Sequence, residues 1–444
     1  MAERLTPTKN ALKRLTTVIL LMLATGQPVA ASTEPETTEA DSLMVNSSET
    51  VPREERKIPD IWSIQAGATA SYMIHAGPDI QAILHSFWAS HYDIRLKWRQ
   101  AKENTSPYDR ALNRPIIQGG LLLGDFSRTK VYREESAYHS TIGRMWTLYG
   151  GMQLELAAGD RWSVGADLQN GISYCTDPYN EHDNADNNII GSHFSLYVNL
   201  GLYARYRMTR RWHIALNIDF KHYSNGSLDR PNLGINAIGP TLALQYDIQP
   251  PTTDDNPDQE KRIIPAAQCQ STGQKLFNKK IYTDFMAGLG MKALIDGFNV
   301  HHSSHNPVYG FPTVMIAPMY HYHLAHATGI GIDYTYADYV YKIKEYDRIL
   351  GFSNYDYSPH ILGLSLRHEV FYRSFSLNVG LGYCLIKKTG HSADTNESKA
   401  YQHVALRYSL PFTGSRFYLG YNVKAYRFQK VDCIQLIAGY RIGW

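Results

Sequence analysis

The sequence predicts an all-β fold, an antiparallel transmembrane β-barrel, on three observations. The chain has 444 residues, which is enough for two domains or one large barrel. From Ile61 onward, apolar and polar residues alternate with a period of two, in segments of about ten residues or more, as membrane-spanning strands do. Tyrosine occurs 32 times, an excess that suits both strands and membrane interfaces.

Two stretches show the alternation clearly. Residues 194–206, FSLYVNLGLYARY, separate a face of large apolar side chains from a face of serine, asparagine, glycine and arginine. Residues 162–174, WSVGADLQNGISY, do the same. A soluble β-sandwich is the alternative, but its strands are typically about five to six residues long. The greater length favours the barrel, and the ending YRIGW resembles the C-terminal signal of bacterial outer-membrane barrels.

The lengths of the connections predict the orientation of the strands. Outer-membrane barrels have short periplasmic turns and longer external loops. Tight connections occur at 158–161, 208–211, 372–374 and 413–415, and long polar ones at 175–191 and 387–399. The strand that begins at Trp212 follows a short turn, so we expect it to run outward and to end at the outer leaflet.

The N-terminus reads as an export signal over residues 1–31. Lys9, Lys13 and Arg14 precede the apolar run LTTVILLMLATG, and small residues suitable for cleavage follow it. A single membrane anchor is the competing interpretation, but the run is too short for one. Residues 32–60 are polar and rich in Thr and Glu, as in a flexible leader.

The strand count predicts two similar halves. About eight strands fit into residues 61–249 and another eight into residues 279–444. Between them, residues 250–278 form a periplasmic linker rich in Pro, Asp and Gln. We therefore predict two tandem eight-stranded barrels, and one sixteen-stranded barrel is the alternative.

The composition excludes some classes of function. The formal net charge is only +3, which gives no field that would favour nucleic acid as a partner. The four cysteines have no zinc-site spacing and no deducible pairing. We expect no cofactor.

The stretch HYSNGSLDRPNLGIN, residues 222–236, places polar side chains on an apolar face. In the strand from Trp212, the apolar phase faces lipid, because a small barrel fills its interior with polar side chains. Continuing this phase puts His222 and Ser224 on the lipid side. A hairpin centred near Asp229 would bring Asn236 opposite His222, within cross-strand reach.

Three polar groups at that depth suit the hydrolysis of an acyl ester. Ser224 would be the nucleophile and His222 its general base. Asn236 would accept a hydrogen bond from the other imidazole nitrogen and so fix the tautomer, although an amide stabilises imidazolium less than a carboxylate does.

The loop that follows would complete the site. Backbone N–H groups of Asn225 and Gly226, or the Asn225 amide, could form an oxyanion hole. We group Asn232 and Gly234 with this loop. The competing interpretation is an external hairpin with a chance His-Ser pair, because the same spacing recurs in NVHHSSHN at 299–306, which we interpret as a loop.

The segment resembles the active-site segment of the lipid A 3-O-deacylase family, PagL-like acyloxyacyl hydrolases that are eight-stranded outer-membrane esterases. That family has His-x-Ser-Asn on the penultimate strand, followed by Pro-Asn-x-Gly-Ile. The matching residues here are His222, Ser224, Asn225, Pro231, Asn232, Gly234 and Ile235. The resemblance covers about residues 61–249, and it implies a carboxylic ester hydrolase that removes an acyl chain from lipid A.

One departure supports a second resemblance. The deacylases place a glutamate after Gly-Ile, where this chain has Asn236. Outer-membrane phospholipase A has His-x-Ser-Asn-Gly and an asparagine at this spacing. That family uses calcium, and Asp229 corresponds to a position near its metal ligands, but it lacks the Pro-Asn-x-Gly-Ile run and has twelve strands.

The resemblance also implies a place and a partner for the protein. We expect the outer membrane of a Gram-negative bacterium, with the active site at the outer leaflet and lipopolysaccharide as partner; a homodimer is left open. Residues 416–428, RFYLGYNVKAYRF, form the penultimate strand of the second half and lack the motif. This half would be a non-catalytic copy, and a structural or porin-like barrel remains the non-enzymatic alternative.

Overall fold

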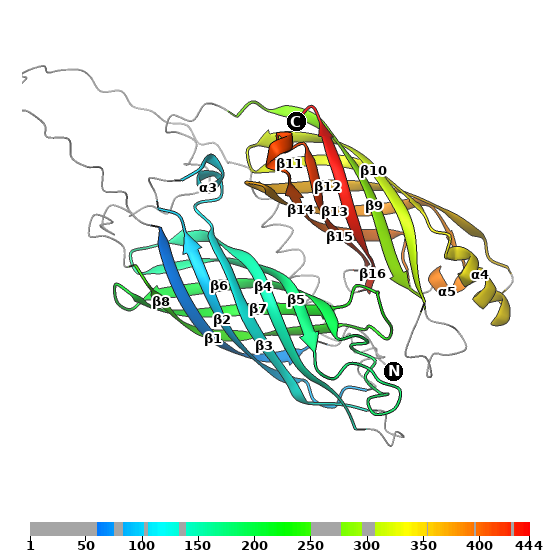
Figure 1. Cartoon of the computed structure of the whole chain (residues 1–444), viewed down its shortest axis with the longest axis horizontal. Coiled ribbons are helices and arrows are strands. Elements are labelled where there is room, and N and C mark those ends of the chain that lie inside the picture. The colour runs from blue at the N-terminus through cyan, green and yellow to red at the C-terminus, as the bar shows by residue number, and fades with distance from the viewer. Residues whose placement is uncertain are drawn as a thin grey trace, which may run out of the picture. The chain divides into compact units, whose positions relative to one another are not determined.

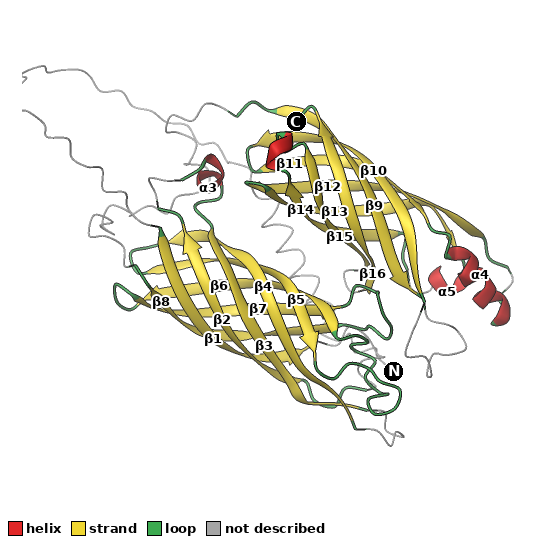
Figure 2. Ribbon diagram, viewed as in Figure 1, coloured by secondary structure: helices red, strands yellow, loops and turns green. Residues whose placement is uncertain are grey.

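The computed structural model describes residues 60–74, 83–101, 105–132, 139–249, 277–294, 307–352, 354–394, 397–427 and 430–444. Within these ranges, almost all regular structure is antiparallel β-strand, and every strand belongs to one of two closed barrels (Figures 1 and 2). The expected export signal, leader and linker, and the NVHHSSHN loop, lie outside the described residues.

The first barrel contains strands β1 to β8 and closes through the pairing of β1 with β8. Its strands are β1 (Ile61–Met73), β2 (Trp88–Arg99), β3 (Ile116–Val131), β4 (Ser140–Ala158), β5 (Trp162–Cys175), β6 (Phe194–Arg207), β7 (Trp212–Ser224) and β8 (Ile235–Asp247). A short helix, α3 (Pro107–Ala111), lies in the β2–β3 connection.

The second barrel contains strands β9 to β16 and closes through the pairing of β9 with β16. Its strands are β9 (Lys280–Ala293), β10 (Val308–His323), β11 (His326–Tyr336), β12 (Tyr357–Tyr372), β13 (Phe375–Thr389), β14 (Ala400–Ser409), β15 (Phe417–Tyr426) and β16 (Lys430–Ile442). Helices α4 (Val340–Ile349) and α5 (His391–Asp394) follow β11 and β13, and a 3-10 turn, η4 (Pro411–Thr413), precedes β15.

Ionic side chains fill the middle of the first barrel. Arg95 donates to Asp167 at 2.8 Å and to Asp93 at 2.6 Å, and all three are buried. Elsewhere in the same barrel, the buried Asp219 accepts from Lys221 at 3.2 Å. Buried charges are tolerated because each is paired and hydrogen-bonded.

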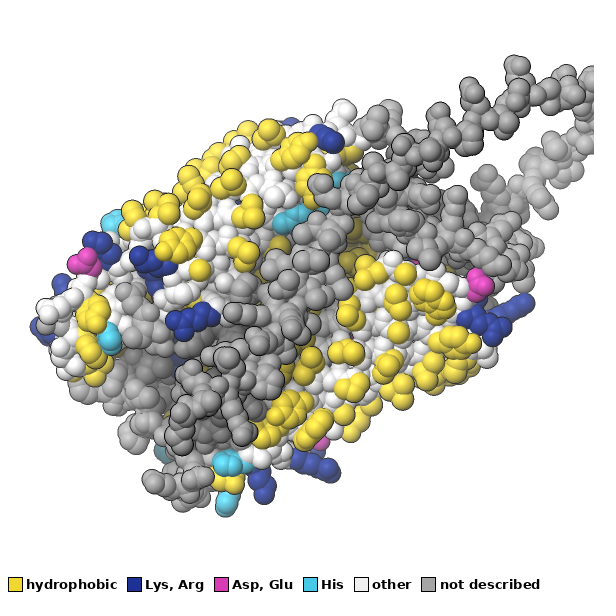
Figure 3. All heavy atoms as spheres, turned by 180° about the vertical axis from the view of Figure 1, so that it is seen from behind, with side chains coloured by type: hydrophobic (Ala, Val, Ile, Leu, Met, Phe, Trp, Pro, Cys, Tyr) yellow, Lys and Arg dark blue, Asp and Glu magenta, His cyan; other side chains and the backbone are white. Residues whose placement is uncertain are grey.

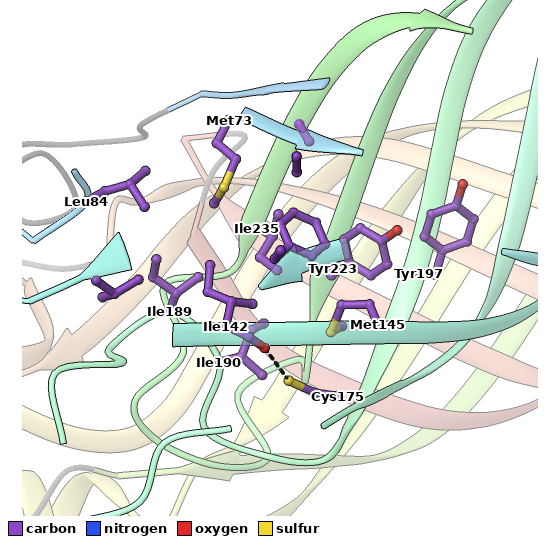
Figure 4. Packing of buried hydrophobic residues seen from close by; sticks show 14 of the residues in the cluster. Met73, Leu84, Ile142, Met145, Cys175, Ile189, Ile190, Tyr197, Tyr223 and Ile235 are labelled. Atoms are coloured by element: carbon purple, nitrogen blue, oxygen red, sulfur yellow. Dashed lines mark hydrogen bonds between the residues drawn. The ribbon is translucent and has the colours of Figure 1, made fainter. Parts of the chain in front are cut away.

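An apolar cluster fills the long-loop end of the same barrel. Figure 4 shows Tyr223 and Tyr197 lying side by side, with Met145 and Ile142 from β4 below them. The ring centroids of Tyr197 and Tyr223 are 5.1 Å apart. Ile189, from the β5–β6 connection, belongs to the same cluster, so a long loop contributes to the core of the barrel.

The second barrel is filled in a similar way. Glu369 accepts from Arg441 at 2.8 Å and from Arg407 at 3.2 Å, and Arg407 also donates to Asp284 at 2.8 Å. All four side chains are completely buried. Val340 and Ile343 of helix α4 pack into an apolar cluster with side chains from the barrel strands.

The prediction of two tandem eight-stranded barrels is confirmed, and the sixteen-stranded alternative is wrong, because each set of eight strands closes by itself. The predicted strand phases are also observed: along β7, exposed and buried residues alternate from Trp212 to Asp219. Figure 3 shows hydrophobic side chains spread over the surface of the strands. No helix in the described part of the chain is long and apolar enough to cross a membrane.

Candidate active site

The candidate site lies on the hairpin formed by β7 and β8. Their antiparallel register pairs His222 with Asn236, as the hairpin centred near Asp229 predicts. His222 follows Phe220 on the face opposite Lys221 and Tyr223, which are buried inside the barrel. The imidazole therefore lies on the outer face of the barrel wall, half-buried.

A hydrogen bond joins the paired residues. His222 Nδ1 lies 2.8 Å from Asn236 Oδ1. Because an amide oxygen can only accept, this contact assigns the proton to Nδ1. Nε2 then carries the lone pair, which is the protonation state that a general base requires.

Ser224 is the last residue of β7 and is 95% buried, although it shares the outward phase with His222. Its Oγ accepts from the Gly226 N–H at 3.2 Å and from Asn232 Nδ2 at 3.0 Å. No hydrogen bond joins Ser224 to His222 in the described structure. The two are nevertheless near neighbours, because a Cβ built on Gly234 would lie 3.5 Å from His222 Cε1 and 3.7 Å from Ser224 Cβ.

The two donors to Ser224 come from a loop whose shape the sequence did not reveal. Gly226 and Ser227 have φ angles of +68° and +67°, which turn the chain back sharply after the strand. Asn232 then returns its amide to Ser224 and accepts from the Asn225 N–H at 3.4 Å. Two N–H donors thus converge on Ser224 Oγ.

The Asn225 side chain takes a different place from that of Asn232. Its amide donates to Ser192 Oγ at 3.1 Å and to the Asp229 carbonyl at 3.1 Å, and its Oδ1 accepts from the Ser227 N–H at 3.1 Å. Asn225 therefore holds the loop closed, while Asn232 contacts Ser224.

The β5–β6 connection supports this loop. The N–H groups of Leu233 and Gly234 donate to the carbonyl oxygens of Asn188 and Ile189 at 3.2 and 2.9 Å. Gly191 approaches so closely that a Cβ there would lie 2.2 Å from the Pro231 carbonyl oxygen. The sequence does not predict this support, because contacts between two loops carry no periodic signal.

Asp229 has a local role in the described structure. Its Oδ1 accepts from the Arg230 N–H at 2.8 Å. No group of three His, Cys, Asp or Glu side chains suited to a metal ion is found in the part of the chain that the structure describes. The assignment of Asp229 to a calcium site stays a prediction of the phospholipase alternative.

The corresponding strand of the second barrel, β15, has a different outward face. Its outward-phase positions are occupied by Phe417, Leu419, Tyr421, Val423 and Ala425, as the sequence predicts. With neither histidine nor serine there, β15 cannot provide the same chemistry.

Two protein-family models match the chain. Residues 128–245 match the lipid A 3-O-deacylase (PagL) model. Residues 281–444 match the model of the acyloxyacyl hydrolase C-terminal domain. Together they span more than half of the chain, and no curated protein matches it.

Several solved structures are similar to this chain. The crystal structure of the outer-membrane enzyme PagL is 15% identical, covering 41% of this chain and 97% of that one, with a TM-score of 0.26. An outer-membrane channel from Pseudomonas putida F1 is 11% identical over 89% of this chain and 100% of its own, with a TM-score of 0.19. A mutant Rh. blastica porin is 6% identical over 86% and 100%, with a TM-score of 0.15.

The family matches agree with the architecture. The PagL match spans the hairpin with His222 and Ser224, and the C-terminal match coincides with the second barrel. The family description implies a hydrolase that acts on an ester bond. Residues 128–245 therefore carry a domain of the lipid A 3-O-deacylase (PagL) type, and residues 281–444 carry a domain of the acyloxyacyl hydrolase C-terminal type.

Proposed function

We propose that the first barrel removes an ester-linked acyl chain from lipid A, with Ser224 as nucleophile, His222 as general base and Asn236 as the residue that orients the imidazole. The observation that carries this proposal is the 2.8 Å contact between His222 Nδ1 and Asn236 Oδ1. It directs the unprotonated Nε2 away from Asn236 and leaves it free for the serine hydroxyl.

In the first half of the reaction, Ser224 Oγ attacks the ester carbonyl carbon and its proton passes to His222 Nε2. The new C–O bond gives a tetrahedral intermediate with a negatively charged oxygen. When the intermediate collapses, the bond to the lipid oxygen breaks and His222 returns the proton to that oxygen. An acyl group remains on Ser224, and the deacylated lipid leaves as an alcohol.

In the second half, water attacks the acyl-serine carbonyl while His222 accepts the proton of the water. Collapse of this intermediate breaks the bond to Ser224 Oγ, which regains its proton from His222. The products are the free fatty acid and the original enzyme.

The Gly226 N–H and the Asn232 amide are the oxyanion donors in this scheme. Both point at Ser224 Oγ, at 3.2 and 3.0 Å, so the oxyanion would form beside them. Donors fixed in advance stabilise the developing charge without reorganisation, and one such donor is worth about 10²–10³-fold in kcat. This role goes to Asn232 rather than Asn225, whose amide is bound elsewhere.

Lipid A fits the position of the site. The outward phase of His222 supports chemistry on the lipid-facing side of the wall, at the end of β7 away from the short turns. With short turns in the periplasm, this end lies at the outer leaflet, where lipopolysaccharide presents its acyl esters.

The test compares purified wild-type protein with Ser224→Ala on lipopolysaccharide, with mass spectrometry of lipid A before and after incubation. Loss of one 3-hydroxy fatty acid is expected with the wild type, and Ser224→Ala should lower the rate by several orders of magnitude. Ser127→Ala, which removes an exposed hydroxyl of β3, is the matched control. Equal release by Ser224→Ala would refute the assignment.

A calcium-dependent phospholipase A is the second candidate, because Asn236 stands where the deacylases have glutamate. Its test uses phospholipid and lipid A side by side, with calcium or with a chelator. Calcium-dependent release from phospholipid alone would favour this candidate.

A structural or porin-like barrel is the third candidate. The ionic groups and the apolar cluster inside the first barrel disfavour an open channel. Ion conductance without release of fatty acid from either lipid would support it.

A further inference from the structure

Two adjacent short turns of the first barrel bring four arginines together. The β4–β5 turn contributes Arg161, and the end of β6 with the β6–β7 turn contributes Arg207, Arg210 and Arg211. The turns are joined, because the Arg207 N–H donates to the Arg161 carbonyl oxygen at 2.6 Å. We call these four residues the arginine rim.

The rim carries positive charge without ionic partners. No ion pair to any of the four is found in the described ranges. Two carboxylates of the neighbouring strands have other partners: Glu155 pairs with Arg99 at 3.0 Å, and Asp247 with His213 at 2.8 Å. Of the turn residues, only Asp160 is acidic. Because Arg161, Arg210 and Arg211 are exposed, the rim presents net positive charge to whatever lies beside the barrel.

Aromatic side chains mark the level of the rim in the membrane. Trp162, Tyr206 and Trp212 are 46%, 46% and 41% exposed on the outer face, directly beside the rim residues. Arg211 donates to the hydroxyl of Tyr246 at 2.7 Å. Exposed Trp and Tyr concentrate at the headgroup level of a bilayer. The guanidinium groups therefore lie where lipid phosphates lie, and Figure 3 shows basic side chains beyond the end of a hydrophobic band.

We propose that the arginine rim binds the phosphate groups of anionic phospholipids in the leaflet at the short-turn end of the barrel. Guanidinium forms paired hydrogen bonds to phosphate, and clusters of basic residues at a membrane surface attract anionic lipid. The backbone of the β6–β7 turn is held in place, because Thr209 Oγ1 accepts from the N–H groups of Arg211 and Trp212 at 3.3 and 3.1 Å.

Other short turns in the chain do not share this feature. The β10–β11 turn, Leu324 and Ala325, carries no charge, and the β12–β13 turn carries a single arginine, Arg373. A run of arginines is therefore no general requirement of a short turn. The rim is a property of the first barrel, at the end of β7 opposite Ser224.

The experiment uses the full-length protein in nanodiscs that contain phosphatidylglycerol and phosphatidylcholine in equal amounts. After mild extraction, native mass spectrometry counts the lipids of each kind that remain bound. R161Q/R210Q/R211Q is compared with R128Q/K130Q/R144Q, which removes three exposed basic side chains from the long-loop end of β3 and β4. Circular dichroism confirms that both variants keep their β-structure.

The wild type should retain phosphatidylglycerol in preference to phosphatidylcholine. We expect R161Q/R210Q/R211Q to reduce this preference by about tenfold or more, and R128Q/K130Q/R144Q to keep it. Higher salt should weaken the wild-type preference, because exposed charges are screened. An equal ratio of the two lipids on the wild type, or equal losses in the two variants, would overturn the proposal.

Discussion

At the scale of single residues, the site combines a histidine with a neutral acceptor. Asn236 Oδ1 can hold the Nδ1 proton of His222 as well as a carboxylate could, and its distance of 2.8 Å is that of an ordinary hydrogen bond. An amide, however, provides no negative charge when the imidazole becomes imidazolium. Asn236 should therefore orient the imidazole of His222, but it should stabilise the imidazolium less than a carboxylate would.

Substitutions at Asn236 separate these two contributions. Asn236→Asp keeps an acceptor at the same place and adds charge, so kcat should stay equal or rise. Asn236→Ala removes the acceptor, and kcat should fall by roughly ten- to a hundredfold by analogy with supporting residues of other sites. Fatty-acid release at saturating lipopolysaccharide provides the measurement. If both variants match the wild type, another residue orients His222.

A substitution at Gly234 tests how closely the loop of residues 225–234 packs against His222 and Ser224. Its φ is +72°, and a Cβ there would lie 3.1 Å from the Tyr223 carbonyl oxygen and 3.5 Å from His222 Cε1. Gly234→Ala should therefore reduce kcat clearly while the barrel still folds. Gly351→Ala is the matched control, because Gly351 also has a positive φ but a Cβ there would meet nothing within 4 Å. Equal activity of both variants would show that this contact does not matter.

At the scale of elements, the β5–β6 connection supports the loop of residues 225–234 through buried asparagines. Asn187 Oδ1 accepts from the N–H groups of Ile189 and Ile190, and its amide donates to the Thr141 and Asp177 carbonyl oxygens. Asn187 is completely buried. It thus fixes the segment whose carbonyl groups accept from the N–H groups of Leu233 and Gly234.

Asn187→Ala should loosen that segment and lower kcat by about tenfold, with little change in KM, because it acts on the placement of Asn232 and Ser224. Asn184→Ala is the control. Asn184 also bonds Thr141 and Asp177, but none of its bonds reaches Ile189 or Ile190. Steady-state rates and thermal unfolding of both variants distinguish positioning from general destabilisation. Equal losses of kcat would assign Asn187 a merely structural role.

The strands could be predicted from the sequence, but the loop could not. A period of two fixes which side chains share a face. The outward phase of His222 and its pairing with Asn236 could therefore be predicted by counting residues along the two strands. The role of Asn232 depends on positive φ angles at Gly226 and Ser227 and on contacts with the β5–β6 connection. Those contacts join residues that are about 45 positions apart, and no local pattern encodes them.

At the scale of the whole molecule, the two barrels have different outer faces but similar interiors. Each closes through its own first and last strands, and each is filled by buried ion pairs. Among the described strands, the hairpin that carries His222 and Ser224 lies in the first barrel. A substitution in the second barrel should therefore lower the stability of the protein without changing the rate of ester hydrolysis.

Glu369→Gln tests this separation. Glu369 accepts from Arg407, Arg441, Ser376 and Tyr282, and it is completely buried. Breaking such a pair leaves buried arginines with less compensation, so the free energy of unfolding should fall by about 3–5 kcal/mol. Urea unfolding in detergent provides the measurement. Lys342→Gln, which removes an exposed pair with Glu345, should leave the midpoint unchanged.

At urea concentrations below the unfolding transition, Glu369→Gln should still release fatty acid at the wild-type rate, because Ser224 and its donors belong to the first barrel. A loss of activity in the folded variant would show that the barrels do not act separately.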